Sequence, residues 1–168
     1  MKWIIFTGTW RLTNKEVEDD VRNAVRECIS NGHGIITGGA LGVDYFCMDE
    51  VLKINKECTN LRVILPAKLD IYTKHFYNAL VDGKITKEDF SKLENTLRTI
   101  QNNNPTSLLE MHFKTISMEE YFARDAEEVK YGDEVYAFQV NNSVGTQDTI
   151  DKATEAGVPV TLHKKYTI

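Results

Sequence analysis

The feature that most constrains the fold is a regular alternation of short apolar runs with longer amphipathic stretches. The runs are rich in Ile and Val and too continuous for a half-exposed sheet, which is typical of parallel strands covered on both faces. Strands that alternate with helices at this spacing predict βαβ units in a doubly wound parallel sheet of about five strands. The expected strands are Trp3–Thr7, Gly34–Thr37, Leu61–Leu65, Glu134–Phe138 and Val158–Leu162.

The stretches between the runs repeat their apolar residues at helical spacing. Thr13 with Glu16, and Ser117 with Glu120, fit the capping-box pattern, so we expect a helix to begin after each pair. Right-handed crossovers limit the topologies, and we expect the strand order 3-2-1-4-5 with a switch point between the first and fourth strands. Further helices are expected over 43–52 and 146–156.

A long segment separates the third expected strand from the fourth. Apolar residues recur at helical spacing over Tyr72–Leu80 and over Phe90–Ile100, and "NNNP" at Asn102–Pro105 ends the second pattern. A structureless loop of this length would be unusual in a compact domain. We expect one domain over 1–168 with a helical insertion at about 66–117, which would cap a site or join two subunits in a homodimer or higher homo-oligomer.

Composition excludes several classes of function. Hydrophobic residues make up 42% of the chain and charged residues 27%, and no apolar run approaches the roughly 18 residues of a membrane span. The apolar start at Trp3–Phe6 is too short for a signal peptide, so we expect a cytoplasmic protein without a membrane partner. The cysteines and histidines lack metal-ligand spacing, so no metal site is expected. A net charge of -5 without a basic cluster makes nucleic acid an unfavoured partner.

Three glycine-containing loops follow the strands that would flank the switch point. They are "TGTWR" at Thr7–Arg11, "TGGALGVD" at Thr37–Asp44 and "NNSVGTQD" at Asn141–Asp148. Ligands of open α/β sheets bind beyond the carboxyl ends of such strands. Two of the loops lead directly into helices, so free N–H groups and the positive helix ends would face the site. The sequence therefore predicts a pocket for a phosphorylated, nucleotide-derived small molecule.

Some of these residues also have a purely structural interpretation. Glycines such as Gly42 would be required by tight turns or close packing in any case. Asp44 would either cap its helix or lie early in it, where the helix dipole stabilises an acid, or else contact a ribose hydroxyl. Arg11 and Arg124 are the candidate cations, and Arg124 lies about 9 Å into its expected helix, close enough to reach the same edge.

Several motifs together resemble the SLOG superfamily, which includes YspA-like, DprA-like and LOG-type proteins. They are "FTGTWR", "GIITGGALGVD", "ARD", "GDEVYAF" and "SVGTQDTIDKATEAGVPV", in this order. The likeness covers roughly Lys2–Leu65 and Tyr121–Leu162 and is greatest to the YspA-like branch. It implies a Rossmann-like fold that binds nucleotides or nucleotide-derived signals. It also implies these pocket residues: Gly8, Thr9, Arg11, Gly38, Gly39, Ala40, Gly42, Asp44, Arg124, Ser143, Gly145 and Thr146.

The chain departs from the pattern of these families at three places. Thr149 stands where LOG-type hydrolases carry a catalytic glutamate, and Asp148 comes one residue too early. An arginine–asparagine pair of the superfamily is Arg124–Asp125 here. Trp10 is an addition to the first loop, where it would stack on a base or pack under the insertion.

We expect binding or sensing of a nucleotide-like ligand, with no further cofactor identified. The alternative is an enzyme that cleaves an N-glycosidic bond, with Asp44, Asp148, Arg124, Glu119 or Glu120 as candidate catalytic residues. A second alternative is DprA-like binding of single-stranded DNA, against which the acidic balance argues.

Overall fold

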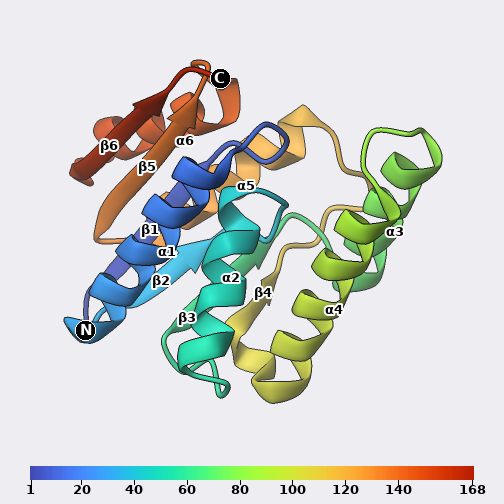
Figure 1. Cartoon of the computed structure of the whole chain (residues 1–168), viewed down its shortest axis with the longest axis horizontal. Helices are drawn as coiled ribbons and strands as arrows, with labels where there is room; N and C mark the ends of the chain where they lie inside the picture. The colour runs from blue at the N-terminus through green and yellow to red at the C-terminus, as the bar shows by residue number, and fades with distance from the viewer.

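A computed structural model describes the whole chain, Met1 to Ile168, as helices packed on both faces of one parallel sheet (Figure 1). Six strands pair in the order β4-β3-β2-β1-β5-β6. The expected order of five strands is confirmed, and one additional strand, β4, extends the sheet beyond β3. The strands are β1 (Trp3–Gly8), β2 (Gly34–Thr37), β3 (Leu61–Leu65), β4 (Leu108–Glu110), β5 (Glu134–Val140) and β6 (Val160–Tyr166).

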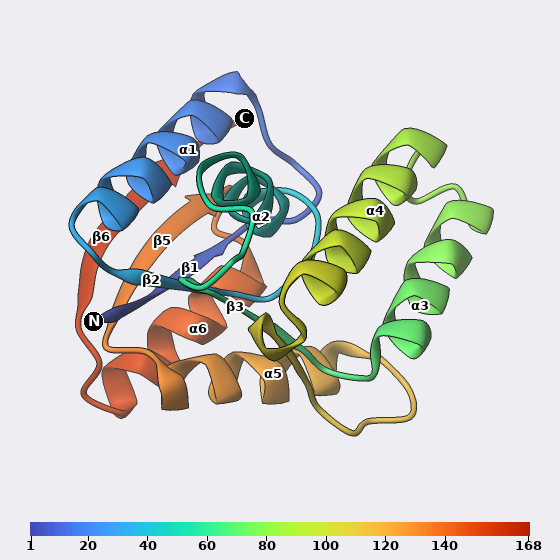
Figure 2. The same ribbon diagram turned by 90° about the horizontal axis from the view of Figure 1, so that it is seen from below.

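Two helical layers enclose the sheet (Figure 2). Alternate residues of each strand point to opposite layers, so Ile4 and Phe6 belong to one core cluster and Ile5 to the other. Continuous apolar runs are required in the inner strands, which helices cover on both faces, whereas the edge strand β6 is partly exposed to water. The helices are α1 (Lys15–Ser30), α2 (Val43–Ile54), α3 (Leu69–Val81), α4 (Lys87–Asn103), α5 (Met118–Tyr131) and α6 (Val144–Glu155), with a 3₁₀ turn at Pro105–Ser107.

The start of α1 differs from the sequence-based expectation. The cap of α1 is Asn14, whose side chain accepts a hydrogen bond from the N–H of Val17, so the capping box expected from Thr13 and Glu16 is wrong. Asn and Thr are both favoured cap residues, so the residue types alone did not show whether the helix begins after Thr13 or after Asn14. The box at Ser117 is confirmed, because the Glu120 carboxylate accepts the Ser117 N–H at 2.8 Å.

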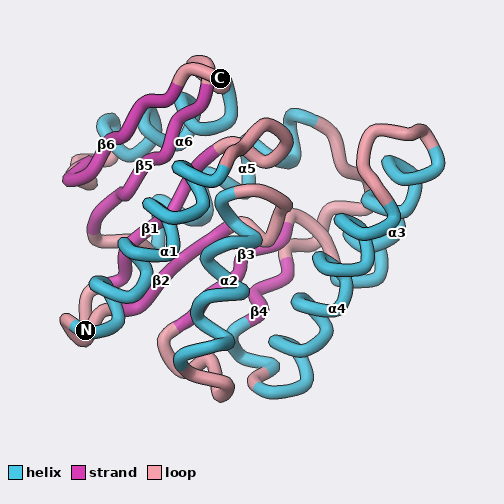
Figure 3. Tube along the Cα trace, viewed as in Figure 1, coloured by secondary structure: helices cyan, strands magenta, loops and turns pink.

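The insertion between β3 and α5 is not entirely helical. It contains the two expected helices, α3 and α4, but also β4, whose residues pair with Val63–Leu65 (Figure 3). Side chains of both helices, including Phe76 and Leu97, belong to the larger core cluster. The insertion therefore completes one edge of the sheet and one side of the core.

None of the helices combines the length and the apolar character that crossing a bilayer would require. A cytoplasmic location and homo-oligomer formation stay predictions.

Leu97→Ala should test how strongly the insertion is joined to the core. Leu97 is fully buried, so the cavity left by its side chain should lower the free energy of unfolding by about 2–5 kcal/mol in urea denaturation. Val81→Ala, at a side chain that is 68% exposed, is the matched control and should change it by less than about 0.5 kcal/mol. A Leu97→Ala change as small as the control would mean that α4 contributes little to the core.

Candidate functional site

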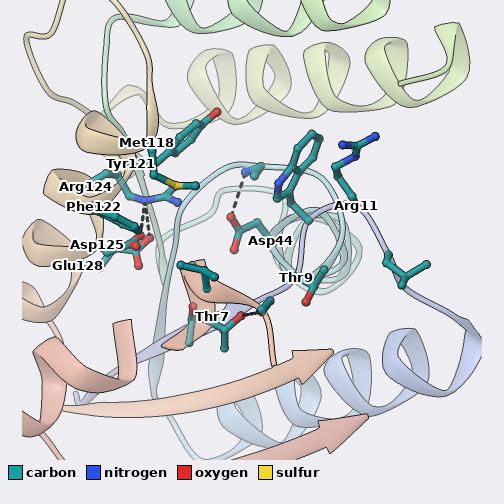
Figure 4. Close-up of a pocket in the computed structure, with 18 of the residues that line it drawn as sticks. Thr7, Thr9, Arg11, Asp44, Met118, Tyr121, Phe122, Arg124, Asp125 and Glu128 are labelled. Atoms are coloured by element: carbon teal, nitrogen blue, oxygen red, sulfur yellow. Dashed lines mark hydrogen bonds and ion pairs between the residues drawn. The ribbon is translucent and has the colours of Figure 1, made fainter. Parts of the chain in front are cut away.

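A cavity of about 360 Å³ opens at the carboxyl ends of β1 and β5, where the strand order reverses (Figure 4). This is the edge at which open α/β sheets bind ligands. Five regions contribute its walls: the loop after β1, the loop from β2 into the start of α2, part of α3, one face of α5 and the start of α6. The lining residues are Thr7, Gly8, Thr9, Trp10, Arg11, Leu12, Ala40, Asp44, Phe76, Met118, Tyr121, Phe122, Arg124, Asp125, Glu128, Ser143, Val144, Gly145 and Thr146.

The loop after β1 is held by backbone contacts to two neighbouring loops. The Thr9 carbonyl accepts the N–H of Val43 at 3.2 Å, and the Thr9 hydroxyl accepts the N–H of Val140 at 3.3 Å. Trp10 then meets Phe76 of α3 edge to face, with ring centroids 6.2 Å apart. Trp10 thus packs against the insertion, one of its two expected roles, while it also lines the cavity.

The start of α6 presents unpaired backbone donors to the cavity. The N–H groups of Val144, Gly145 and Thr146 have no partner in the protein, as is usual for the first turn of a helix. The side chain of Ser143 does not cap them, because its hydroxyl pairs with that of Thr146 at 2.6 Å. Unpaired donors at the positive end of a helix are the arrangement that suits an anion.

One face of α5 brings an arginine and two acids to the cavity. Arg124, Asp125 and Glu128 are all more than nine-tenths buried. The Arg124 guanidinium lies 3.1 Å from the Asp125 carboxylate and 3.5 Å from that of Glu128, and it donates a hydrogen bond to the Gly38 carbonyl at 2.5 Å. Figure 4 shows this cluster on one side of the cavity, with Asp44 facing it.

Burial changes the protonation of these acids. It raises the pKa of Asp125 to about 7, against the opposing effect of Arg124 and with a further increase from nearby Asp148. Burial also raises the pKa of Glu128 well above its usual range. A carboxyl group with a pKa near neutrality can either donate or accept a proton at physiological pH, which is the property of a general acid or base.

Asp44 lies in the first turn of α2, and its carboxylate is committed to the preceding loop. One oxygen accepts the Thr37 hydroxyl at 2.8 Å, and the other accepts the N–H of Ala40 at 3.1 Å. The side chain is 7% exposed and lines the cavity. Asp44 does not cap α2, because the N-cap is Gly42 and no side chain caps it; Asp44 instead lies in the first turn, where the helix dipole stabilises an acid. A contact with a ligand hydroxyl stays a prediction.

The glycines of the second loop lie outside the cavity wall. A Cβ at Gly38 would overlap the Arg124 guanidinium, and one at Gly39 would meet Val63 and Leu65. Gly42 has a φ of 65°, and a Cβ there would overlap the Thr9 carbonyl. These three glycines therefore make room for protein atoms. By contrast, nothing lies within 4 Å of a Cβ placed at Gly145, which lines the cavity.

Of the acids suggested from the sequence as catalytic candidates, only Asp44 lines the cavity. Asp148 forms an ion pair with Lys152, and neither Asp148 nor Glu119 or Glu120 lines the cavity. The hydroxyl of Thr149, at the expected glutamate position, accepts that of Thr7 at 3.3 Å. No group of three His, Cys, Asp or Glu side chains has the arrangement of a metal site.

Sequence reasoning missed most of the α5 wall. Tyr121, Arg124 and Glu128 lie on one helical face at spacings of three and four residues. The rings of Phe76 and Phe122 and the side chain of Met118 were missed as well. The spacing was available in the sequence, but it could not show that this face turns toward the loops.

Asp125→Asn tests the charge balance through the pH dependence of stability. Folding raises the pKa of Asp125 from 3.8 to about 7, so the folded chain holds the proton over this range. The contribution of Asp125 to the free energy of unfolding therefore falls as pH rises from about 4 to about 7. The variant cannot ionise, so urea denaturation should show it to be more stable than the wild type by up to about 4 kcal/mol above pH 7, and little changed near pH 4.

Glu155→Gln, at an exposed acid of α6, is the control and should show no such pH dependence. A stability difference between Asp125→Asn and the wild type that is constant from pH 4 to pH 8 would contradict the raised pKa.

No protein-family model and no curated protein sequence matches the chain. Solved structures do match. DNA processing protein A of Helicobacter pylori, described with a single-stranded DNA binding mode, is 18% identical, with a TM-score of 0.68 over 95% of this chain and 63% of that one. DNA processing protein A of Streptococcus pneumoniae is 15% identical, with a TM-score of 0.60 over 99% of this chain and 50% of that one.

A third match is the molybdenum cofactor carrier protein of Chlamydomonas reinhardtii, at 16% identity and a TM-score of 0.58 over 99% of this chain and 79% of that one. The chain thus spans less than two thirds of either DNA processing protein. At these identities the likeness concerns the fold. The chain has the Rossmann-like fold that its motifs implied, whereas membership of the SLOG superfamily and a place in its YspA-like branch stay predictions.

Proposed function

We propose that the chain binds a nucleotide or nucleotide-derived phosphorylated small molecule in the cavity at the sheet edge. The observation that carries this proposal is the set of unpaired N–H groups at Val144, Gly145 and Thr146, which open into a cavity with aromatic walls. The donors suit a phosphate, and the rings suit a base. A cavity of about 360 Å³ lies in the range of small-molecule sites.

Single-stranded DNA is a less favoured ligand. The H. pylori neighbour is described as binding it. Here, however, three buried acids, Asp44, Asp125 and Glu128, lie in the cavity, and the net charge of the chain is -5. A polyanion gains its affinity mainly from contacts with many cations, and this cavity has only Arg11 and Arg124.

Gly145→Asp tests the phosphate corner directly. The new carboxylate would have open space and would stand beside the free donors of α6, where it is compatible with the helix but repels a phosphate. Isothermal titration of AMP, GMP, CMP and UMP should show the best of them binding about tenfold more weakly to the variant. Gly145→Asn, the uncharged control, should bind close to the wild-type level.

The corresponding nucleosides should bind more weakly than the monophosphates and should lose little in Gly145→Asp. Equal binding of nucleoside and monophosphate to the wild type would remove the phosphate corner from the proposal, and no binding of any nucleotide would refute the proposal itself.

N-glycosidic hydrolysis is a second candidate function, favoured by one observation. Asp125 and Glu128 line the cavity as buried acids, so they supply the proton-transfer groups that Thr149 cannot. In this candidate Asp125 donates a proton to the departing base, and Arg124 neutralises the acids in their ionised forms. Asp44 is less suited because both of its carboxylate oxygens are already engaged.

Release of free base from nucleoside monophosphates, followed by chromatography, tests this candidate. Asp125→Asn and Glu128→Gln should each lower the rate by about 10²-fold or more, the usual contribution of a general acid or base. Glu155→Gln should leave the rate unchanged. If the wild type returns all nucleotide intact after long incubation, the chain binds without turnover.

A further inference from the structure

A second cavity, of about 340 Å³, lies on the other side of the loop after β1. It is bounded by this loop, the loop into α2 with the first turn of that helix, the segment that joins α3 to α4, and the first two turns of α4. The insertion therefore helps to form both cavities, through Phe76 in the first and through Lys84 and Ile85 in the second. The residues that line the second cavity are Trp10, Arg11, Thr13, Leu41, Gly42, Tyr45, Phe46, Lys84, Ile85, Asp89 and Lys92.

The two cavities share a wall made by Trp10 and Arg11, which line both of them. The edge-to-face contact with Phe76 fixes the indole, and the Arg11 guanidinium lies 5.3 Å from the centre of the Trp10 ring. Arg11 forms no ion pair with any acid of the chain, whereas Arg124 contacts Gly38, Asp125 and Glu128 through its Nε and Nη1 groups. Figure 4 shows Arg11 directed away from the α5 cluster. The free cation of the site is therefore on the boundary between the cavities.

The second cavity carries an excess of positive charge. Arg11, Lys84 and Lys92 line it with a single acid, Asp89. The Asp89 carboxylate is engaged in the capping box of α4, where it accepts the Thr86 N–H at 3.4 Å. Lys84 lies 3.9 Å from exposed Asp82, and Lys92 pairs with exposed Glu88 at 2.7 Å. Exposed pairs of this kind are weak, so both lysines can turn to an anionic group in the cavity.

Aromatic rings accompany these cations. Tyr45 and Phe46 lie together on α2, with ring centroids 6.3 Å apart, and Trp10 closes the opposite side. Rings beside cations are the combination that accepts a base and its phosphate. The volume of the second cavity nearly equals that of the first. Each cavity can therefore take a unit of similar size.

We propose that the ligand is a dinucleotide, with one nucleotide unit in each cavity and the linking phosphate beside Arg11. This inference rests on the proposed function, because it places the first unit at the corner formed by α6. It adds the requirement for a second unit, held by Lys84 and Lys92 and stacked against the rings of the second cavity. The two halves of the site would then differ in charge, because acids line the first cavity and cations line the second.

Titration calorimetry at constant ionic strength tests the proposal. The probes are AMP, GMP, CMP and UMP, the corresponding 5′-phosphorylated 3′–5′ dinucleotides, and 5′–5′-linked diadenosine diphosphate. The best dinucleotide should bind about tenfold more tightly than its monophosphate. Comparison of the 3′–5′ and 5′–5′ linkages shows which class of dinucleotide the site accepts. In the double variant Lys84→Ala/Lys92→Ala this ratio should fall to about twofold, with binding of the monophosphate unchanged.

Lys74→Ala/Lys87→Ala is the matched control. It removes the same charge from exposed positions on α3 and α4 outside both cavities and should keep the wild-type ratio. Equal affinity for monophosphate and dinucleotide would overturn the inference and leave the proposed function standing. Tighter dinucleotide binding that survives in Lys84→Ala/Lys92→Ala would also overturn it, because the second unit would then bind elsewhere.

Two further outcomes complete the test. If neither monophosphates nor dinucleotides bind, both the inference and the proposed function fail. If affinity continues to rise from the dinucleotide to a single-stranded dodecamer, with a strong dependence on salt, the two cavities are part of a nucleic-acid groove and the dinucleotide proposal is wrong.

Discussion

The site depends on the contacts that the buried Arg124 guanidinium makes. This group joins α5, on one face of the sheet, to the carbonyl of Gly38 at the end of β2. A buried cation is costly unless it is paired, and Asp125 and Glu128 provide the pairing from the same helix. The position of Arg124 also explains Gly38, since any larger side chain would occupy the same space. One charge thus constrains a helix, a loop and two acids.

The remaining loops meet around this arrangement because the sheet reverses its strand order between β1 and β5. Backbone hydrogen bonds from Val43 and Val140 to Thr9 join the three loops directly. Gly42 permits the close approach, since a Cβ there would overlap the Thr9 carbonyl. The insertion then adds Phe76 against Trp10, which turns an open edge into a cavity. Gly42 thus serves a contact between loops, and the cavity is lined mainly by side chains and by the first turn of α6.

The acids of the cavity distinguish this chain from the pattern that its motifs resemble. Thr149 replaces the glutamate of LOG-type enzymes, and its hydroxyl is engaged with Thr7. Asp125 replaces an asparagine, and burial gives it a pKa of about 7. An amide would pair with Arg124 without titrating, whereas the carboxyl group adds a proton-transfer site. The titratable acids that line the cavity therefore lie on α5 and α2 and not on α6.

The sequence by itself determined the layers, the order of five strands and the three loops at the sheet edge, because strands buried on both faces need continuous apolar runs and short right-handed crossovers leave few orders. It did not reveal β4, whose three residues are too few for a periodic pattern and form a strand only by pairing with β3. Nor did it show that Arg124 meets Gly38, 86 positions away, or that Asp125, Glu128 and Phe76 line the cavity. Only the tertiary structure decided these points, because the rotation of α5 and α3 about their axes depends on contacts between distant residues, which no local pattern records.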